Sequence, residues 1–239
     1  MNNTYISQMS VSGGTSDGEN GCSCSDETSR GGFSVVKHGA FRIACLTVIG
    51  QIEGHSKLPP DSKTTCYEHL IPLLLSAECS DETDGVLVIL NTVGGDVEAG
   101  LALAELIAGM KKPVVSLVLG GAHSIGIPLA VAADVSLVAK TATLTVHPVR
   151  INGLVLAVPQ SFDVLRDMQD RIIGFVCENS HISPARFREL MFNSCELATD
   201  IGTVLGGEDA VNEGLLDKIA TLSDAFTELE NLIIEKKRD

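Results

Sequence analysis

The 239-residue sequence lacks any apolar run that approaches the roughly 20 residues a membrane-spanning helix needs. Its first residues, MNNTYISQMS, also lack the apolar core of a signal peptide. We therefore expect a soluble, cytoplasmic protein without direct membrane insertion. Hydrophobic residues nevertheless make up 44% of the chain and charged residues only 20%, which is typical of a globular domain with a large core.

Basic residues are also few, with 17 Lys and Arg against 31 Asp and Glu and a net charge of −14. Nucleic-acid binding depends on basic side chains that neutralise phosphates, so we expect no such partner. The seven cysteines show no zinc-ligand spacing, since the closest pair, Cys22 and Cys24, stands as C-S-C. Cys45 lies in an apolar strand pattern and Cys177 in a helical one. We expect reduced thiols, no disulfide, no metal and no cofactor.

Apolar residues are almost absent from residues 1–32, which are rich in Ser, Gly, Asn and Thr. Such a segment buries too little surface to offset the conformational entropy that it would lose on ordering. We predict a disordered N-terminal tail over residues 1–32 and one folded domain over residues 33–239.

The rest of the chain alternates between strand-length apolar runs and helical patterns. Strands are predicted at 41–49, 85–90 and 114–119, and helices at 64–77 and 97–110. Short connections between alternating strands and helices imply βαβ crossovers and a largely parallel sheet, hence an α/β fold. Later helices are predicted at 160–179, 184–192, 208–216 and 223–235. Asp96 and Ser223 are the expected N-caps of two of these helices.

Ser124 stands at the turn between the third predicted strand and an apolar helix, directly after GGAH. A serine at such a turn is displayed, and the backbone amides at the start of a helix favour a developing negative charge. Acyl transfer needs this arrangement of a nucleophile beside oxyanion donors. His147 follows a further strand, 23 residues after the serine, and is a candidate base. The pattern predicts a serine hydrolase.

Each of these residues also has a purely structural interpretation. Ser124 could cap the helix at a tight turn, and Ala122 stands where a G-x-S-x-G motif has its first glycine. His147 could be a core histidine with a satisfied hydrogen bond. His123 is a rival base, but adjacent side chains at such a turn usually point apart, so we assign it to packing in the cleft.

Five segments carry a recognisable family pattern: IGQIEGH (49–55), LNTVGGDVEAGLALAELI (90–107), GGAHSIGIPLAVAA (120–133), TLTVHPV (143–149) and EDAVNEGLLDKI (208–219). Through them the chain resembles the ClpP family of self-compartmentalising serine peptidases over roughly residues 40–232. Within that family it is similar to the group of translocation-enhancing proteins (TepA). The resemblance implies a ClpP/crotonase-like fold of stacked βαβ units, with the helix at 160–179 as a protruding handle for association between rings.

The resemblance also implies the roles of individual residues. Ser124 matches the nucleophile and His147 the general base, while Gly95 and Ile125 match the positions whose backbone amides form the oxyanion hole. The triad acid matches less well, because Asp200 lies two residues too far upstream of the family signature at 208–217. Three other carboxylates remain as alternatives: Asp134, Glu208 and Asp217.

The implied function is a serine endopeptidase that hydrolyses unfolded or small proteins and peptides inside a homo-oligomeric chamber of stacked rings, a double heptamer. Because the chain has no Walker A motif, the unfolding of substrates would need a separate ATP-dependent unfoldase. An inactive ClpP-like scaffold is one alternative, suggested by the displaced Asp200 and by Pro148 directly after the histidine. A crotonase-type acyl-CoA enzyme is another, since residues 120–144 are also similar to that fold, although the carboxylate and CoA features that it needs are missing.

Overall fold

The computed structural model describes residues 32–150, 158–194 and 201–238. Residues 1–31 of the predicted tail, and Asp200, lie outside these ranges. The strands are β1 (Phe33–His38), β2 (Phe41–Glu53), β3 (Thr64–Cys66), β4 (Gly85–Gly95), β5 (Val114–Ala122), β6 (Val135–Val138), β7 (Thr143–Val146), β8 (Thr203–Gly206) and β9 (Lys218–Ile219). The helices are α1 (Tyr67–Cys79), α2 (Val97–Ala108), α3 (Gly126–Val131), α4 (Val158–Glu178), α5 (Pro184–Phe192), α6 (Gly207–Asn212) and α7 (Leu222–Lys236).

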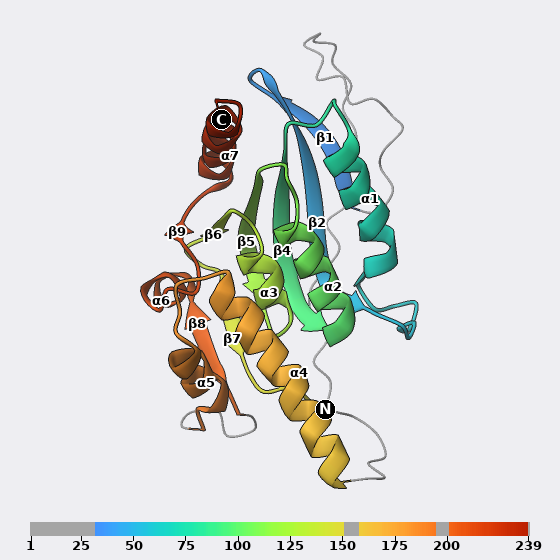
Figure 1. The fold of residues 1–239 in the computed structure, drawn as a ribbon, viewed down its shortest axis with the longest axis vertical. Helices are drawn as coiled ribbons and strands as arrows, with labels where there is room; N and C mark the ends of the chain where they lie inside the picture. The colour runs from blue at the N-terminus through green and yellow to red at the C-terminus, as the bar shows by residue number, and fades with distance from the viewer. Residues whose placement is uncertain (1–31, 151–157, 195–200, 239) are drawn as a thin grey trace, which may run out of the picture.

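The sheet is largely parallel, as the alternating pattern predicts. Its order is β1-β2-β4-β5-β6-β9, with β1 antiparallel to β2 and every following pair parallel (Figure 1). β7 and β8 form an antiparallel pair that joins the end of β5 at the single position Gly121↔Thr143. The predicted α/β class and ClpP-type architecture are confirmed.

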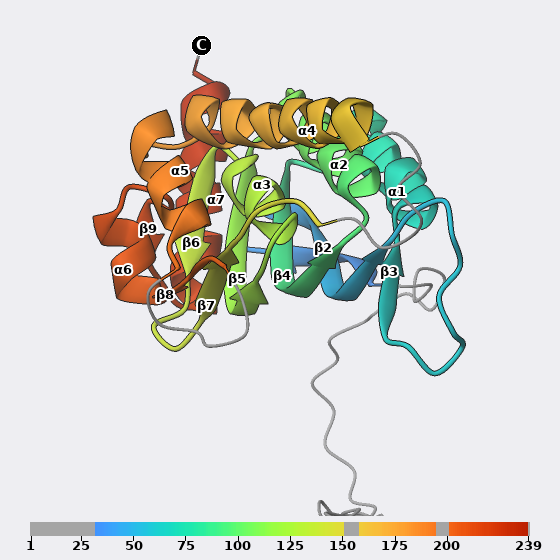
Figure 2. The same cartoon turned by 90° about the horizontal axis from the view of Figure 1, so that it is seen from below.

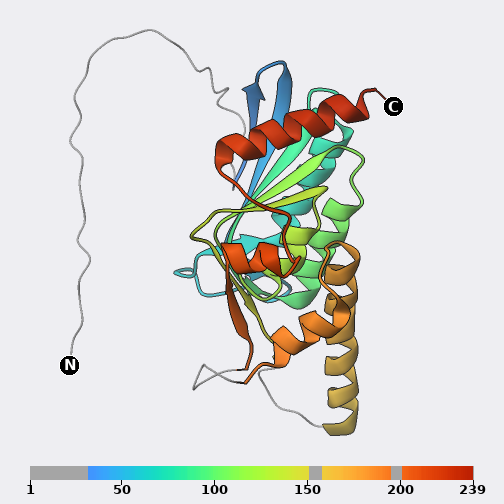
Figure 3. The same cartoon turned by 90° about the vertical axis from the view of Figure 1, so that its left-hand side faces the viewer.

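Helices cover both faces of this sheet. α1, α2 and α3 lie on one face with α4 across them, whereas α7 lies on the other (Figures 2 and 3). Successive side chains of β4 point to opposite faces of the sheet, so this strand contributes to the core on each face. Val86 and Val88 pack in the cluster that contains residues of α1–α4, and Leu87 packs against α7. The first residues of α4 extend beyond the sheet, as expected for a protruding helix (Figure 1).

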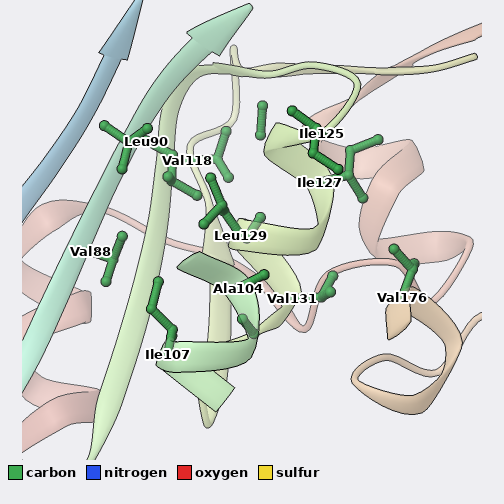
Figure 4. Packing of buried hydrophobic residues seen from close by; sticks show 14 of the residues in the cluster. Val88, Leu90, Ala104, Ile107, Val118, Ile125, Ile127, Leu129, Val131 and Val176 are labelled. Carbon is green, nitrogen blue, oxygen red and sulfur yellow. The ribbon is translucent and has the colours of Figure 1, made fainter. Parts of the chain in front are cut away.

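The larger core holds the end of β5 and α3 in place, and these two elements flank Ser124. Val118 of β5 lies beside Leu129 of α3, in a cluster that also contains Ile127 and side chains of α2 (Figure 4). All six residues of α3 are buried. Since interiors are close-packed, the turn between β5 and α3 is held rigidly by its surroundings.

The structure corrects several predicted boundaries. β2 continues to Glu53, beyond its predicted end at residue 49, because it pairs with β3 on one side and β4 on the other. α1 starts only at Tyr67, since the hydroxyl of Thr65 bonds to the backbone of Ile49 instead of capping the helix. The last helix is capped by Thr221, which forms a capping box with Asp224, and not by Ser223. The strands β8 and β9 were not predicted.

Other predicted features agree with the structure. The Asp96 side chain caps α2 by accepting from the amide of Ala99 at 2.9 Å, and Ser183 caps α5 in the same way. Burial raises the pKa of the Cys45 thiol to about 11, so this thiol stays protonated at neutral pH. Within the described ranges, no helix is both long enough and apolar enough to cross a membrane.

Candidate active site

A cavity of about 320 Å³ lies at the carboxyl ends of β4 and β5, where the chain turns into α2 and α3. Four of the five predicted site residues line it: Gly95, Ser124, Ile125 and His147. They come from three separate segments of sequence, and the fold brings them to one place. The fifth, Asp200, lies outside the described residues.

Ser124 has a backbone conformation that L-residues seldom adopt. Its φ is +56°, and it is the one non-glycine residue with a positive φ in the part of the chain that the structure describes. Such a conformation costs on the order of 1–3 kcal/mol and persists only where the surroundings enforce it. Here the Ser124 amide donates to the carbonyl of Thr145 at 2.9 Å, and the Ser124 carbonyl accepts from Ile127 at 3.0 Å. These two hydrogen bonds hold the turn of Ser124 in its positive-φ conformation.

The backbone of β4 approaches the serine closely because two glycines end this strand. A Cβ on Gly94 would lie 2.8 Å from the Cβ of Ser124, and a Cβ on Gly95 would lie 2.1 Å from the carbonyl oxygen of Ile52. Gly95 also has a φ of +156°, within the range that favours glycine. No side chain therefore separates the end of β4 from Ser124. Among the described residues no backbone carbonyl accepts from the Ile125 amide, which leaves this donor available at the cavity wall.

His147 follows directly after β7, and its ring is oriented by its neighbour. Nδ1 lies 2.7 Å from the carbonyl oxygen of Pro148. A carbonyl can only accept, so we assign the proton of the neutral ring to Nδ1 and the lone pair to Nε2. This tautomer is the one that a general base requires.

His123, the rival base, is engaged elsewhere. Its Nδ1 lies 2.8 Å from the hydroxyl oxygen of Thr145. Burial, and secondarily the positive charge of His147, lower the pKa of His123 below its usual value. His123 is absent from the cavity wall, which His147 lines. The geometry favours His147 as the base beside Ser124.

Comparisons with known proteins identify the family of the chain. The family model described as Clp protease matches residues 47–223, a range that includes both Ser124 and His147. The chain belongs to the Clp protease family. It is 57% identical over 191 residues, 80% of this chain and 75% of the relative, to the translocation-enhancing protein TepA of Halalkalibacterium halodurans. It is 26% identical over 152 residues, 64% of this chain and 73% of the relative, to the ATP-dependent Clp protease proteolytic subunit 2 of Prochlorococcus marinus. Membership of this family supports a peptidase function.

The alternative acids all have partners away from the Clp-type cavity, and none of them lines it. Asp134 accepts from the amide of Val114 at 2.7 Å. Asp217 accepts from the amide and the hydroxyl of Ser136, each at 2.8 Å. Glu208 pairs with Lys140 at 3.4 Å on the surface. Each of the three carboxylates therefore has a structural partner away from the cavity. Of the candidate acids named from the sequence, Asp200 is the one that these contacts do not argue against.

Several cavity residues were not singled out from the sequence. Val97, Ile127, Ile172, Phe187 and Met191 form an apolar wall beside Ser124, supplied by α2, α3, α4 and α5. Ile172 lies in the helix predicted at 160–179, but helical periodicity does not separate a residue that faces a cavity from one that faces the core. Thr145 was missed as well, although it stands two residues before His147 and so shares its face of the strand.

Proposed function

We propose that this Clp-family protein is a cytoplasmic serine endopeptidase that cleaves unfolded or small polypeptides, with Ser124 as nucleophile and His147 as general base. One observation carries the proposal. Ser124 is held in a strained turn conformation on the wall of a cavity that His147 also lines, and the ring tautomer of His147 leaves Nε2 free to accept a proton. Backbone strain at a half-buried serine on a cavity wall is typical of an activated nucleophile.

The reaction follows from these positions. Ser124 Oγ attacks the carbonyl carbon of a peptide bond while His147 Nε2 takes the hydroxyl proton. The amides of Gly95 and Ile125 donate to the oxygen that becomes negative, and the dipole of the following helix adds to this stabilisation. His147 then gives the proton to the leaving amine, and the acyl-enzyme is hydrolysed by water along the same route.

Asp200 is the proposed third member. Gly202, only two residues away, packs against His147, with the position of its missing Cβ 2.9 Å from the His147 Cβ. Two residues of chain span at most about 7 Å, and this short separation in sequence from a residue that contacts His147 supports Asp200 as the proposed acid. In this role it would join or replace the carbonyl of Pro148 as the acceptor.

The cavity also suggests which peptide bonds are cleaved. Apolar side chains of four helices form one wall beside Ser124, Gln51 and Arg150 also line the cavity, and no Asp or Glu of the described residues does. The apolar wall favours an apolar side chain on the acyl side of the bond. The lack of a lining carboxylate within the described ranges also counts against crotonase-type chemistry, which needs one at the site.

We further propose that the protein assembles into stacked rings, a double heptamer, and receives substrates from a separate ATP-dependent unfoldase. Phe162 and Val164 on the first turns of α4 are 64% and 57% exposed, which leaves apolar surface for another subunit to cover. Sedimentation measures the state of assembly directly, and a stable monomer at ordinary salt would exclude the rings.

A fluorophosphonate probe tests the chemistry, with the modified residue located by peptide mass mapping. We expect modification at Ser124 and none in Ser124→Ala, a variant that keeps a Cβ and leaves the turn unchanged. An inactive scaffold is favoured by a specific observation, since a carbonyl and not a carboxylate accepts from Nδ1 among the described residues. Absence of labelling in folded, assembled protein would support that scaffold and contradict the peptidase proposal.

A further inference from the structure

His123 and Ser124, adjacent residues of the turn before α3, both form a hydrogen bond with Thr145 of β7. The Ser124 amide donates to the Thr145 carbonyl at 2.9 Å, and the His123 ring bonds to the Thr145 hydroxyl at 2.8 Å. Thr145 is two residues from His147, so one residue connects the turn that carries the predicted nucleophile with the strand that carries the predicted base. The first contact is backbone only, and the second depends on the side chains of His123 and Thr145.

Among the described residues, β7 pairs with β5 at the single position Gly121↔Thr143, and its remaining strand pairing is with β8. Its side chains Leu144 and Val146 pack in the core, which is not directional. The two hydrogen bonds of Thr145 are therefore the directional contacts that align β7 with the turn of Ser124. A small displacement there would move His147 with it, because only Val146 lies between.

The His123 ring is itself held in place. A Cβ on Gly121 would lie 2.4 Å from its Nε2, so the ring packs directly over the bare backbone of β5. The His123 amide donates to the Thr92 carbonyl at 3.1 Å and its carbonyl accepts from Gly126 at 2.9 Å. With backbone and ring both fixed, Nδ1 has little freedom to follow a moving Thr145, which makes the contact a rigid link.

We propose that His123 is a positioning residue for the peptidase reaction, which sets the distance between Ser124 and His147 through its hydrogen bond to Thr145. The inference rests on the function proposed above. Loss of the link should slow the attack of Ser124 and leave substrate binding unchanged, because neither His123 nor Thr145 lines the cavity. A displacement of about 1 Å at reacting groups costs on the order of 10²-fold in rate.

The experiment measures the second-order rate of fluorophosphonate modification, and kcat and KM for an apolar peptide substrate, in the full-length assembled protein. The variants are His123→Leu, the isosteric Thr145→Val and the double variant. We expect each single variant to lower the modification rate and kcat by roughly 10- to 100-fold at unchanged KM. The double variant should be no slower than the slower single one, since both remove the same bond.

Conservative variants separate positioning from folding. Asn keeps polar atoms at the place of Nδ1, so His123→Asn should recover most of the rate, and Thr145→Ser should do so by keeping the hydroxyl. Thr227→Val is a matched control, because the Thr227 hydroxyl bonds to a carbonyl within α7, far from the cavity. It should leave all rates unchanged.

The outcomes distinguish the two proposals. Wild-type rates in His123→Leu and Thr145→Val, with Ser124 still labelled, would overturn the positioning role and leave the peptidase function intact. Additive losses that follow the loss of thermal stability, without rescue by Asn or Ser, would also overturn it. If Ser124 of the wild type is not labelled at all, the proposed function fails and the inference fails with it.

Discussion

Gly202 packs against His147 so closely that only a glycine fits. A Cβ on Gly202 would lie 2.4 Å from the Val146 carbonyl oxygen and 2.9 Å from the Cβ of His147, and its φ is +138°. The register of β7 and β8 produces this contact, because the pair Val146↔Thr203 comes directly before it. Position 202 therefore controls how closely the start of β8 approaches His147.

Gly202→Ala should lower both stability and activity. The new Cβ cannot be accommodated without moving His147 or the backbone, and φ is unfavourable for alanine, so we expect a loss on the order of 2 kcal/mol. The displaced histidine should reduce kcat more than it raises KM. Gly174→Ala is the control, since a Cβ there meets nothing within 4 Å. Lying inside α4, it should gain up to about 1 kcal/mol and keep full activity, and equal losses in the two variants would contradict the argument.

Asp200→Asn tests the third member of the proposed triad. If this carboxylate sets the tautomer of His147 and stabilises its protonated form, kcat should fall on the order of 10⁴-fold with little change in KM. An unchanged rate would eliminate Asp200 and leave the Pro148 carbonyl as the sole acceptor of the Nδ1 proton.

For Asp217→Asn we expect the opposite result, a loss of stability without a loss of catalytic rate. Asp217 accepts from the amide and hydroxyl of Ser136, so its loss should cost about 1–3 kcal/mol of stability through weakened charge-assisted hydrogen bonds. The catalytic rate at a temperature well below unfolding should not change. Thermal denaturation and peptide hydrolysis on the same preparation separate the two effects, and a large fall in kcat would return Asp217 to the list of candidate acids.

The elements beside Ser124 could be predicted because each has a local signal. Buried parallel strands appear as continuous apolar runs, and Asp96 followed by a helical pattern marks an N-cap. The small residues before Ser124 indicate a tight turn without reference to the rest of the chain. The turns after β4 and before α3 could therefore be located in advance, whereas the roles of Gly95 and Ile125 were implied by the family resemblance.

What could not be predicted depends on contacts between distant segments. β8 and β9 have only four and two residues, and they are strands because β7 and β6 pair with them. Thr221 and Ser223 were both competent caps, and the choice depends on which one has a partner at the third helical residue, Asp224. The hydrogen bond between the Thr145 hydroxyl and the His123 ring also could not be predicted, because no periodic pattern in the sequence indicates it.

An ion pair between α2 and α4 should affect how the apolar wall of the cavity binds substrate. Arg171 binds Glu98 through two hydrogen bonds of 2.7 and 3.2 Å, and each residue is next to a cavity residue, Ile172 and Val97 respectively. The hydrogen bond from Arg171 lowers the pKa of the Glu98 carboxyl. Both side chains are about half exposed, so the stability that depends on the pair should stay below about 1 kcal/mol.

Glu98→Gln should therefore act mainly on substrate binding. We expect a several-fold rise in KM for peptides with a large apolar side chain, an unchanged kcat, and a difference from wild type that shrinks at high salt. Glu228→Gln is the matched control, since it breaks the surface pair of Lys218 and Glu228 on the far face of the sheet. An equal effect of both substitutions would show a general response to lost charge and contradict a specific role for the α2–α4 pair.

The pH dependence of stability should carry a contribution from His123. Burial, and secondarily the positive charge of His147, lower the pKa of His123 in the folded protein, whereas an unfolded histidine titrates near about 6.5. The unfolded chain therefore binds this proton more readily than the folded one. The stabilising contribution is complete above about pH 6.5 and is lost as the pH falls from there through the folded pKa.

His123→Asn removes this titration and keeps a hydrogen-bonding group near Thr145. Thermal unfolding of wild type and variant between about pH 7.5 and about pH 5 should show a steeper decline of Tm in the wild type. All other titrating groups are common to the two proteins, so the comparison isolates His123 together with its coupling to His147. If Tm fell with pH equally in the two proteins, His123 would bind its proton equally well in the folded and unfolded states. The burial of its ring would then not lower its pKa, which would contradict the prediction.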